Sequence, residues 1–129
     1  MATFDDVRRL GQRLPEVQEA PSYRGMPALK VRGKPFCRLW SDNEHRRDGV
    51  HDSAVLVVFC DIEEKDALIA TSAGALFTTA HYDGYGAVLV RLADIELDLL
   101  VDLLEDSYRS RAPKRLVRQL EEGPCGLPA

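Results

Sequence analysis

The segment Ala54-Val-Leu-Val-Val-Phe-Cys60 is continuously apolar and rich in β-branched residues. A strand with one face in water alternates apolar and polar side chains, whereas this segment has no polar position. It is therefore predicted to be a central β-strand that is covered on both faces. The other strands of the sheet are expected on either side of it.

Two short alternating runs before this segment, Ala28 to Val31 and Phe36 to Trp40, flank Gly33-Lys34-Pro35 and predict a β-hairpin. Hydrophobic matching favours a three-residue loop that pairs Lys30 with Arg38. This register places four apolar side chains on the core face: Leu29, Val31, Cys37 and Leu39. It places the remaining side chains on the outer face: Lys30, Arg32, Phe36, Arg38 and Trp40. The polar segment from Ser41 to Asp52 is expected to be a solvent-exposed loop.

The elements after the central strand are expected to alternate between helix and hairpin. Asp61 is placed to cap a short helix, with Glu64 at the capping-box position. The runs Leu76 to Thr79 and Ala87 to Leu92 predict a second hairpin, because Asp83-Gly84 between them is a turn sequence.

Helices are also predicted at both ends of the chain. Thr3 can cap a first helix whose apolar residues recur at helical spacing, a longer helix is expected from Asp94, and a final one from Pro113. The predicted order is a helix, three strands, a helix, two strands and one or two helices, α-β(3)-α-β(2)-α(α). This order indicates an α+β fold of two layers, an antiparallel sheet with helices on one face. One domain is expected over residues 1–123, followed by a flexible tail at 124–129.

The composition of the 129-residue chain is that of an ordinary globular domain, with 45% hydrophobic and 29% charged residues. Its net charge of -4 argues against a protein that coats nucleic acid non-specifically, although a local basic patch remains compatible with it. The three cysteines form no CxxC pair, which argues against a disulfide framework and fits a reducing, cytoplasmic compartment. No signal peptide, membrane span, nucleotide fingerprint or metal-ligand spacing is visible, so no membrane, cofactor or metal is expected.

Basic residues are concentrated in two parts of the sequence. Residues 24–47 contain seven basic and two acidic side chains, and residues 109–118 contain five basic and no acidic ones. Like charges on paired strands repel each other, and a helix that begins at Pro113 offers free N–H groups, so both parts favour an anionic partner. The alternatives are a solvated surface and ion pairs with the acidic helix at 94–106.

An aromatic turn, Tyr82-Asp83-Gly84-Tyr85-Gly86, follows His81. Its rings could stack on a base or a peptide, or they could pin the second hairpin to the core. His81 with a carboxylate such as Asp83 would be the pair used by an enzyme. No Ser or Cys nucleophile motif accompanies them, and the chain is not expected to be an enzyme.

Three stretches occur in order: Ser22-Tyr-Arg-Gly-Met-Pro-Ala-Leu-Lys-Val31 continuing to Lys34-Pro-Phe36, then His81-Tyr-Asp-Gly-Tyr85, then Arg111-Ala-Pro-Lys-Arg115. Together they resemble the MmcQ/YjbR family of small bacterial proteins, and the likeness extends from the first helix to the last. The resemblance implies a two-layer α+β fold like that of type III secretion chaperones, also described as a double wing, and a DNA-binding role. It carries over these positions: Tyr23, Lys30, Lys34, Phe36, His81, Tyr82, Tyr85, Pro113, Lys114 and Arg115. The chain departs from the family pattern at Gly86, where relatives often have a bulky residue, and in the long Asn43 to Asp52 loop.

The leading hypothesis is therefore a DNA-binding, or otherwise anion-binding, module without catalytic residues. Its predicted contacts are Lys30, Arg32, Lys34, Arg38, His81, Tyr82, Tyr85, Arg111, Lys114, Arg115 and Arg118. The alternative hypothesis is a protein-interaction or chaperone-like adaptor that binds a partner, or a second copy of itself, through Trp40, Leu99 or Leu103.

Overall fold

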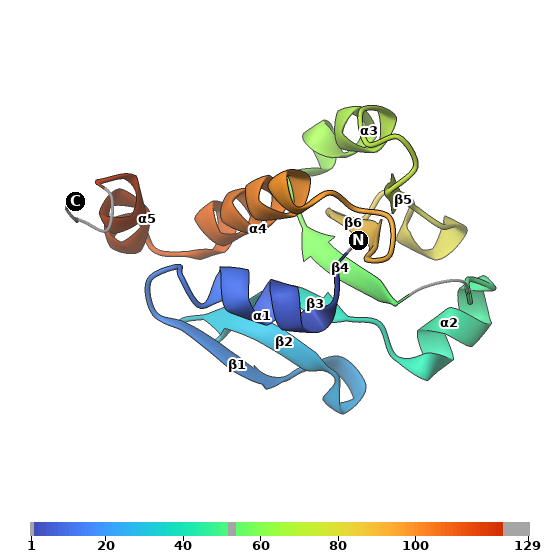
Figure 1. Cartoon of the computed structure of the whole chain (residues 1–129), viewed down its shortest axis with the longest axis horizontal. Helices are drawn as coiled ribbons and strands as arrows, with labels where there is room; N and C mark the ends of the chain where they lie inside the picture. Colours follow the sequence, from blue (N-terminus) through green and yellow to red (C-terminus); the bar gives the residue numbers. More distant parts are fainter. Residues whose placement is uncertain (1, 52–53, 123–129) are drawn as a thin grey trace.

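The central feature of the computed structural model, which describes residues 2–51 and 54–122, is a six-stranded antiparallel sheet (Figure 1). Its spatial order is β1-β2-β3-β4-β6-β5. The strands are β1 (Val17–Pro21), β2 (Pro27–Val31), β3 (Lys34–Leu39), β4 (Val55–Phe59), β5 (Leu76–Phe77) and β6 (Ala87–Arg91). The predicted central strand is β4, which pairs with β3 on one side and β6 on the other. This part of the prediction is confirmed.

Most of the helices cover one face of this sheet, as predicted for an α+β fold (Figure 1). The helix that follows β3 lies against the other face, where its His45 contacts Trp40. They are α1 (Phe4–Gly11), α2 (Asp42–Asp48), α3 (Ile62–Ala70), α4 (Leu97–Arg111) and α5 (Lys114–Glu121), with two 3-10 turns, η1 (Tyr23–Gly25) and η2 (Ala80–Tyr82). Helix α4 packs on β3 and β4 and also contacts α1, while α3 packs on β5 and β6. No helix within residues 2–51 and 54–122 is both long and apolar enough to cross a membrane.

The side chains of β4 enter two separate cores, which explains why the whole strand is apolar. Leu56 and Val58 belong to the main core beneath the helices. Val55, Val57 and Phe59 point to the other face and belong to a smaller core. Its remaining buried members are Trp40, Tyr82, Ala87 and Leu89.

The register predicted for the first hairpin is wrong. Its turn has two residues, Arg32 and Gly33, both with positive φ (53° and 79°), which is the conformation favoured by the twist of paired strands. The ladder pairs Leu29 with Cys37 but then Lys30 with Pro35. A bulge therefore absorbs the extra residue, Phe36, which is buried instead of lying on the outer face.

Two elements were missed because their sequences are polar. The segment Val17–Pro21 forms the edge strand β1 and pairs with β2, although apolar and polar residues alternate poorly in it. The predicted loop after Trp40 contains helix α2. The helix begins with a capping box, in which Ser41 and Glu44 each accept a hydrogen bond from the other's backbone N–H, and it ends at Gly49 with φ of 70°.

The C-terminal helix α5 lies beyond the end of α4, at one end of the molecule (Figure 1). Pro113, the predicted first helical residue, is instead the N-cap of α5, so the helix begins one position later, at Lys114. Leu116 is fully buried and joins the main core, so it holds α5 against the rest of the domain. The predicted tail at 124–129 lies outside the described residues.

Candidate functional site

Glu16 brings the two basic parts of the sequence together in space. It lies in the turn between α1 and β1. Its Oε1 is 2.8 Å from Nε of Arg32, at the tip of the β2–β3 hairpin, and its Oε2 is 3.4 Å from Nη2 of Arg115 on α5. The hairpin tip and α5 therefore lie together at the end of the sheet where β1 begins (Figure 1).

Three more cations lie at this end of the sheet, on β3 and α5. Lys34, Lys114 and Arg118 are exposed, and no ion pair joins them to an acid in the described parts of the chain. Glu121 on the same helix α5 is 3.8 Å from Arg109 instead. We define the basic end as these five residues: Arg32, Lys34, Lys114, Arg115 and Arg118.

The start of α5 adds uncharged hydrogen-bond donors to the basic end. The first N–H groups of any helix lack an intrahelical acceptor. No side chain among residues 2–51 and 54–122 caps α5, because its N-cap residue is Pro113. Lys114 and Arg115 are the first two residues of the helix, so their N–H groups and side chains are close to each other.

A pocket of about 310 Å³ lies where β4 ends, β6 begins and α4 ends. Two predicted contact residues, Tyr85 and Arg111, line it. The other lining residues are Phe59, Cys60, Asp61, Gly86 and Ser110. The Arg111 guanidinium lies 4.5 Å from the centre of the Phe59 ring, and 50% of Tyr85 is exposed. The pocket thus combines an exposed phenol ring with a planar cation.

A buried lysine donates hydrogen bonds to the turn that carries Tyr85. Lys65 on α3 is 3% exposed, and its Nζ donates hydrogen bonds to the backbone oxygens of Tyr82 (2.6 Å) and Tyr85 (3.0 Å). The next residue, Gly86, has no room for a side chain, because a Cβ there would lie 2.9 Å from the backbone oxygen of Cys60. Lys65 was not predicted from the sequence. The sequence does contain a signal for its burial: Lys65 precedes Leu68 and Ile69, the apolar residues on the inner side of α3, by three and four residues and so lies on the same side of the helix.

Arg38 and Tyr82, two predicted DNA contacts, belong instead to a largely buried polar network. The guanidinium of Arg38 donates to both carboxylate oxygens of Glu44, each at 2.8 Å, and to Tyr82 Oη at 3.2 Å. Tyr82 Oη in turn donates to Glu44 Oε2 at 2.8 Å and accepts from Trp40 Nε1 at 3.3 Å. The prediction that these side chains face an external partner is wrong, because helix α2 brings the carboxylate of Glu44 over them.

The Glu44 carboxyl has a strongly shifted pKa. Burial raises the pKa, but hydrogen bonds from Arg38, from the backbone N–H of Ser41 and from Tyr82 outweigh burial and lower it to about 2. Glu44 is therefore ionised at neutral pH, and it stays mostly ionised in moderately acidic solution. The network joins β3, α2 and the turn before β6, so it fixes the second face of the sheet.

The remaining predicted contacts lie away from the pocket. Lys30 is half-exposed between its strand partners Gln18 and Pro35. His81 is exposed on η2, with its ring edge-on to Tyr82 at 5.4 Å. Neither residue lines the pocket of Tyr85.

The apolar contacts expected for an adaptor are mostly core residues. Trp40 and Leu103 are buried, and Leu99 is half-buried against the main core. The prediction that Trp40 and Leu103 form an exposed contact surface is wrong, because α4 turns Leu103 toward the sheet and the second core encloses Trp40.

Cys37 lies outside the pocket and the basic end. Cys37 is buried, and burial raises the pKa of its thiol to about 12, so it acts as a small apolar side chain. Within residues 2–51 and 54–122, no group of three or more His, Cys, Asp or Glu side chains is placed to hold a metal ion.

Known proteins resemble this chain in sequence and in fold. The uncharacterized proteins Rv2570 of Mycobacterium tuberculosis and Mb2600 of Mycobacterium bovis are each 40% identical to this chain over 124 residues, covering 92% of this chain and 95% of each relative. A crystal structure of the Deinococcus radiodurans protein DR2400, with the family-model domain DUF419, matches with a TM-score of 0.67. The match covers 99% of this chain and 91% of that chain at 23% sequence identity, so it shows a shared fold.

The sequence also matches a family model. The model is that of YjbR, and the match covers residues 12–110. This range runs from the end of α1 to the end of α4 and includes both hairpins. The chain belongs to the YjbR family.

Proposed function

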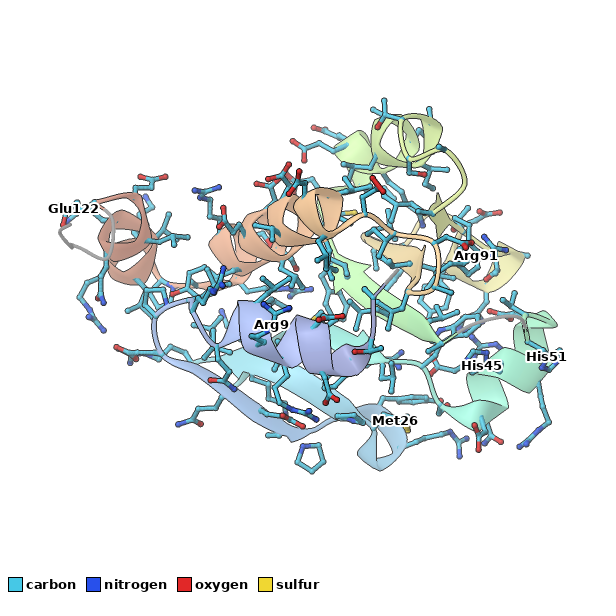
Figure 2. All side chains as sticks on the ribbon, viewed as in Figure 1. Arg9, Met26, His45, His51, Arg91 and Glu122 are labelled. Atoms are coloured by element: carbon cyan, nitrogen blue, oxygen red, sulfur yellow. The ribbon has the colours of Figure 1, made fainter. Side chains whose placement is uncertain are left out.

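We propose that this chain binds DNA by contacting backbone phosphates with the basic end. The observation that carries the proposal is the position of Glu16. It pairs with both Arg32 and Arg115 and so holds the two basic segments next to each other. The five cations outnumber the acids of this end, Glu16 and, at the far end of α5, Glu121 and Glu122 (Figure 2). Positive charge is therefore in excess there, in a chain whose net charge is -4.

Three properties of the basic end suit phosphate groups. Lys34, Lys114 and Arg118 are exposed and unpaired among the described residues, so binding a phosphate breaks no existing ion pair. The uncapped start of α5 supplies N–H groups and the positive end of a helix dipole. Arg32 and Arg115 share one acceptor, so each retains guanidinium donors for a second one.

The negative charge of the rest of the molecule limits how DNA can bind. Helix α4 carries Asp98, Asp102, Glu105 and Asp106. These side chains repel phosphates, so contact is confined to one face and the expected affinity is modest. Phosphate contacts release counterions, and binding is therefore expected to weaken steeply as salt is added.

The proposal is tested by fluorescence anisotropy with labelled DNA at low salt. The variant combines Lys34→Ala, Lys114→Ala and Arg118→Ala. The matched control removes the same charge elsewhere, with Arg9→Ala, Arg24→Ala and Arg46→Ala, since these exposed arginines lie on α1, η1 and α2.

The basic-end variant is expected to lose affinity by at least about tenfold, because three phosphate contacts are removed. The control is expected to lose much less. Equal losses in the two variants would show that overall charge matters and the basic end does not. Absence of binding by the wild-type protein at low salt would end the proposal.

A further inference from the structure

Tyr85 is a half-exposed aromatic side chain that contacts two other rings. Its two aromatic neighbours are Phe59, at 6.3 Å and 66°, and Tyr82, at 5.7 Å and 68°. Both pairs are T-shaped, so among residues 2–51 and 54–122 no ring is stacked parallel on Tyr85. Half of this large apolar side chain remains exposed at the mouth of the pocket.

Arg111 provides a second planar group in the same pocket. Its guanidinium lies over the Phe59 ring at 4.5 Å, and it forms no ion pair with an acid in the described parts of the chain. Planar cations stack on aromatic rings and on nucleic-acid bases alike. A flat, uncharged ligand therefore finds stacking surfaces on Tyr85 and on Arg111.

The rim of the pocket offers hydrogen-bond partners of both kinds. Asp61 contributes an exposed carboxylate, which accepts, and Arg111 contributes N–H groups, which donate. The edges of bases carry both donors and acceptors. A volume of about 310 Å³ lies at the lower end of the range for small-molecule pockets, roughly 300–1,000 Å³, and admits one flat ring system.

The pocket is next to the basic end. Arg111 is the last residue of α4, and Lys114, three residues later, is the first residue of α5. Three residues of extended chain span at most about 11 Å, so the pocket and the first cation of α5 are close enough to contact neighbouring nucleotides. Lys65 also anchors the turn that carries Tyr85, because its Nζ donates to the backbone oxygens of Tyr82 and Tyr85.

We infer that the Tyr85 pocket binds an unstacked base of single-stranded DNA whose phosphates lie on the basic end. The inference rests on the proposed function and adds that the DNA bound is single-stranded. Bases in a duplex are stacked on both sides, so their faces cannot reach Tyr85 without being flipped out. Single strands present bases that are free to stack on aromatic side chains.

The test compares two labelled oligonucleotides with equal numbers of phosphates. One is a twelve-residue oligo-dT, with this length chosen to cover roughly one binding site. The other has the same backbone with every base replaced by an abasic analogue. Affinities are measured for the wild-type protein, Tyr85→Ala and Tyr85→Phe, with thermal unfolding as the check on folding.

The wild-type protein is expected to prefer oligo-dT by roughly tenfold, the scale measured for one stacked base. Tyr85→Ala removes the preference and leaves affinity for the abasic strand unchanged, whereas Tyr85→Phe retains both. Equal affinity of the wild-type protein for the two strands would overturn the base pocket and leave phosphate binding intact. A preference that survives in Tyr85→Ala would overturn the assignment to this pocket. Failure of both strands to bind would overturn the proposed function itself.

Discussion

Replacing Glu44 with Gln is expected to destabilise the domain strongly at neutral pH and weakly in acid. The substitution keeps the shape of the side chain but removes the charge that pairs with Arg38. The guanidinium of Arg38, whose side chain is 11% exposed, then stays buried without a counterion. Removing one partner of a buried ion pair is costly for this reason.

The size of the effect follows from the pKa of Glu44. The pKa is lowered from 4.5 to about 2 in the folded protein. At 1.36 kcal/mol per pKa unit, this difference corresponds to about 3 kcal/mol of folding free energy. Because the folded pKa is depressed, this stability is fully present above pH 4.5 and is lost as the pH falls toward 2. About half of it remains at pH 3.

The assay is urea denaturation at pH 7 and pH 3, followed by the fluorescence of Trp40. This is the single tryptophan of the chain, and its Nε1 donates to Tyr82 Oη within the same network. The control is Glu63→Gln, which changes an exposed residue of α3. A Glu44→Gln variant within about 1 kcal/mol of the wild-type protein at pH 7, or a difference that does not shrink at pH 3, would refute the reasoning.

Two further predictions concern the turn that carries Tyr85. Lys65→Met removes the hydrogen bonds to the backbone oxygens of Tyr82 and Tyr85, so amide hydrogen exchange at residues 82–86 is expected to become faster and stability to fall by about 1–3 kcal/mol. Unchanged exchange would mean that the lysine does not hold the turn. Gly86→Ala places a Cβ 2.9 Å from the Cys60 oxygen and is expected to cost about 1–3 kcal/mol in chemical denaturation. A variant as stable as the wild-type protein would show that the backbones approach less closely.

Much of the fold was predictable because local patterns determine it. The run from Ala54 to Cys60 has no polar position, and the structure places it between two cores. Helices α1 and α4 were indicated by apolar residues at helical spacing. The edge strand β1 and helix α2 were missed because an edge strand and a short surface helix bury few side chains and so leave a weak apolar pattern.

The candidate site was only partly predictable, because contacts between distant segments decide it. Both basic clusters were visible in the sequence, but the carboxylate of Glu16 that joins them is a single residue between two elements. The sequence predicts an outward-facing Arg38, because its partner Glu44 lies in a polar segment whose composition predicts a loop rather than helix α2. The bulge at Phe36 likewise changes which residues face outward, and apolar matching alone does not reveal it.

The dependence of DNA affinity on salt tests the proposed function most directly. The logarithm of the dissociation constant is measured against the logarithm of the salt concentration for the wild-type protein, for the variant with Lys34, Lys114 and Arg118 changed to Ala, and for the matched control. Each lost phosphate contact lowers the slope by about one, so the basic-end variant is expected to lose about three and the control close to none. An unchanged slope in the basic-end variant would contradict phosphate binding at the basic end.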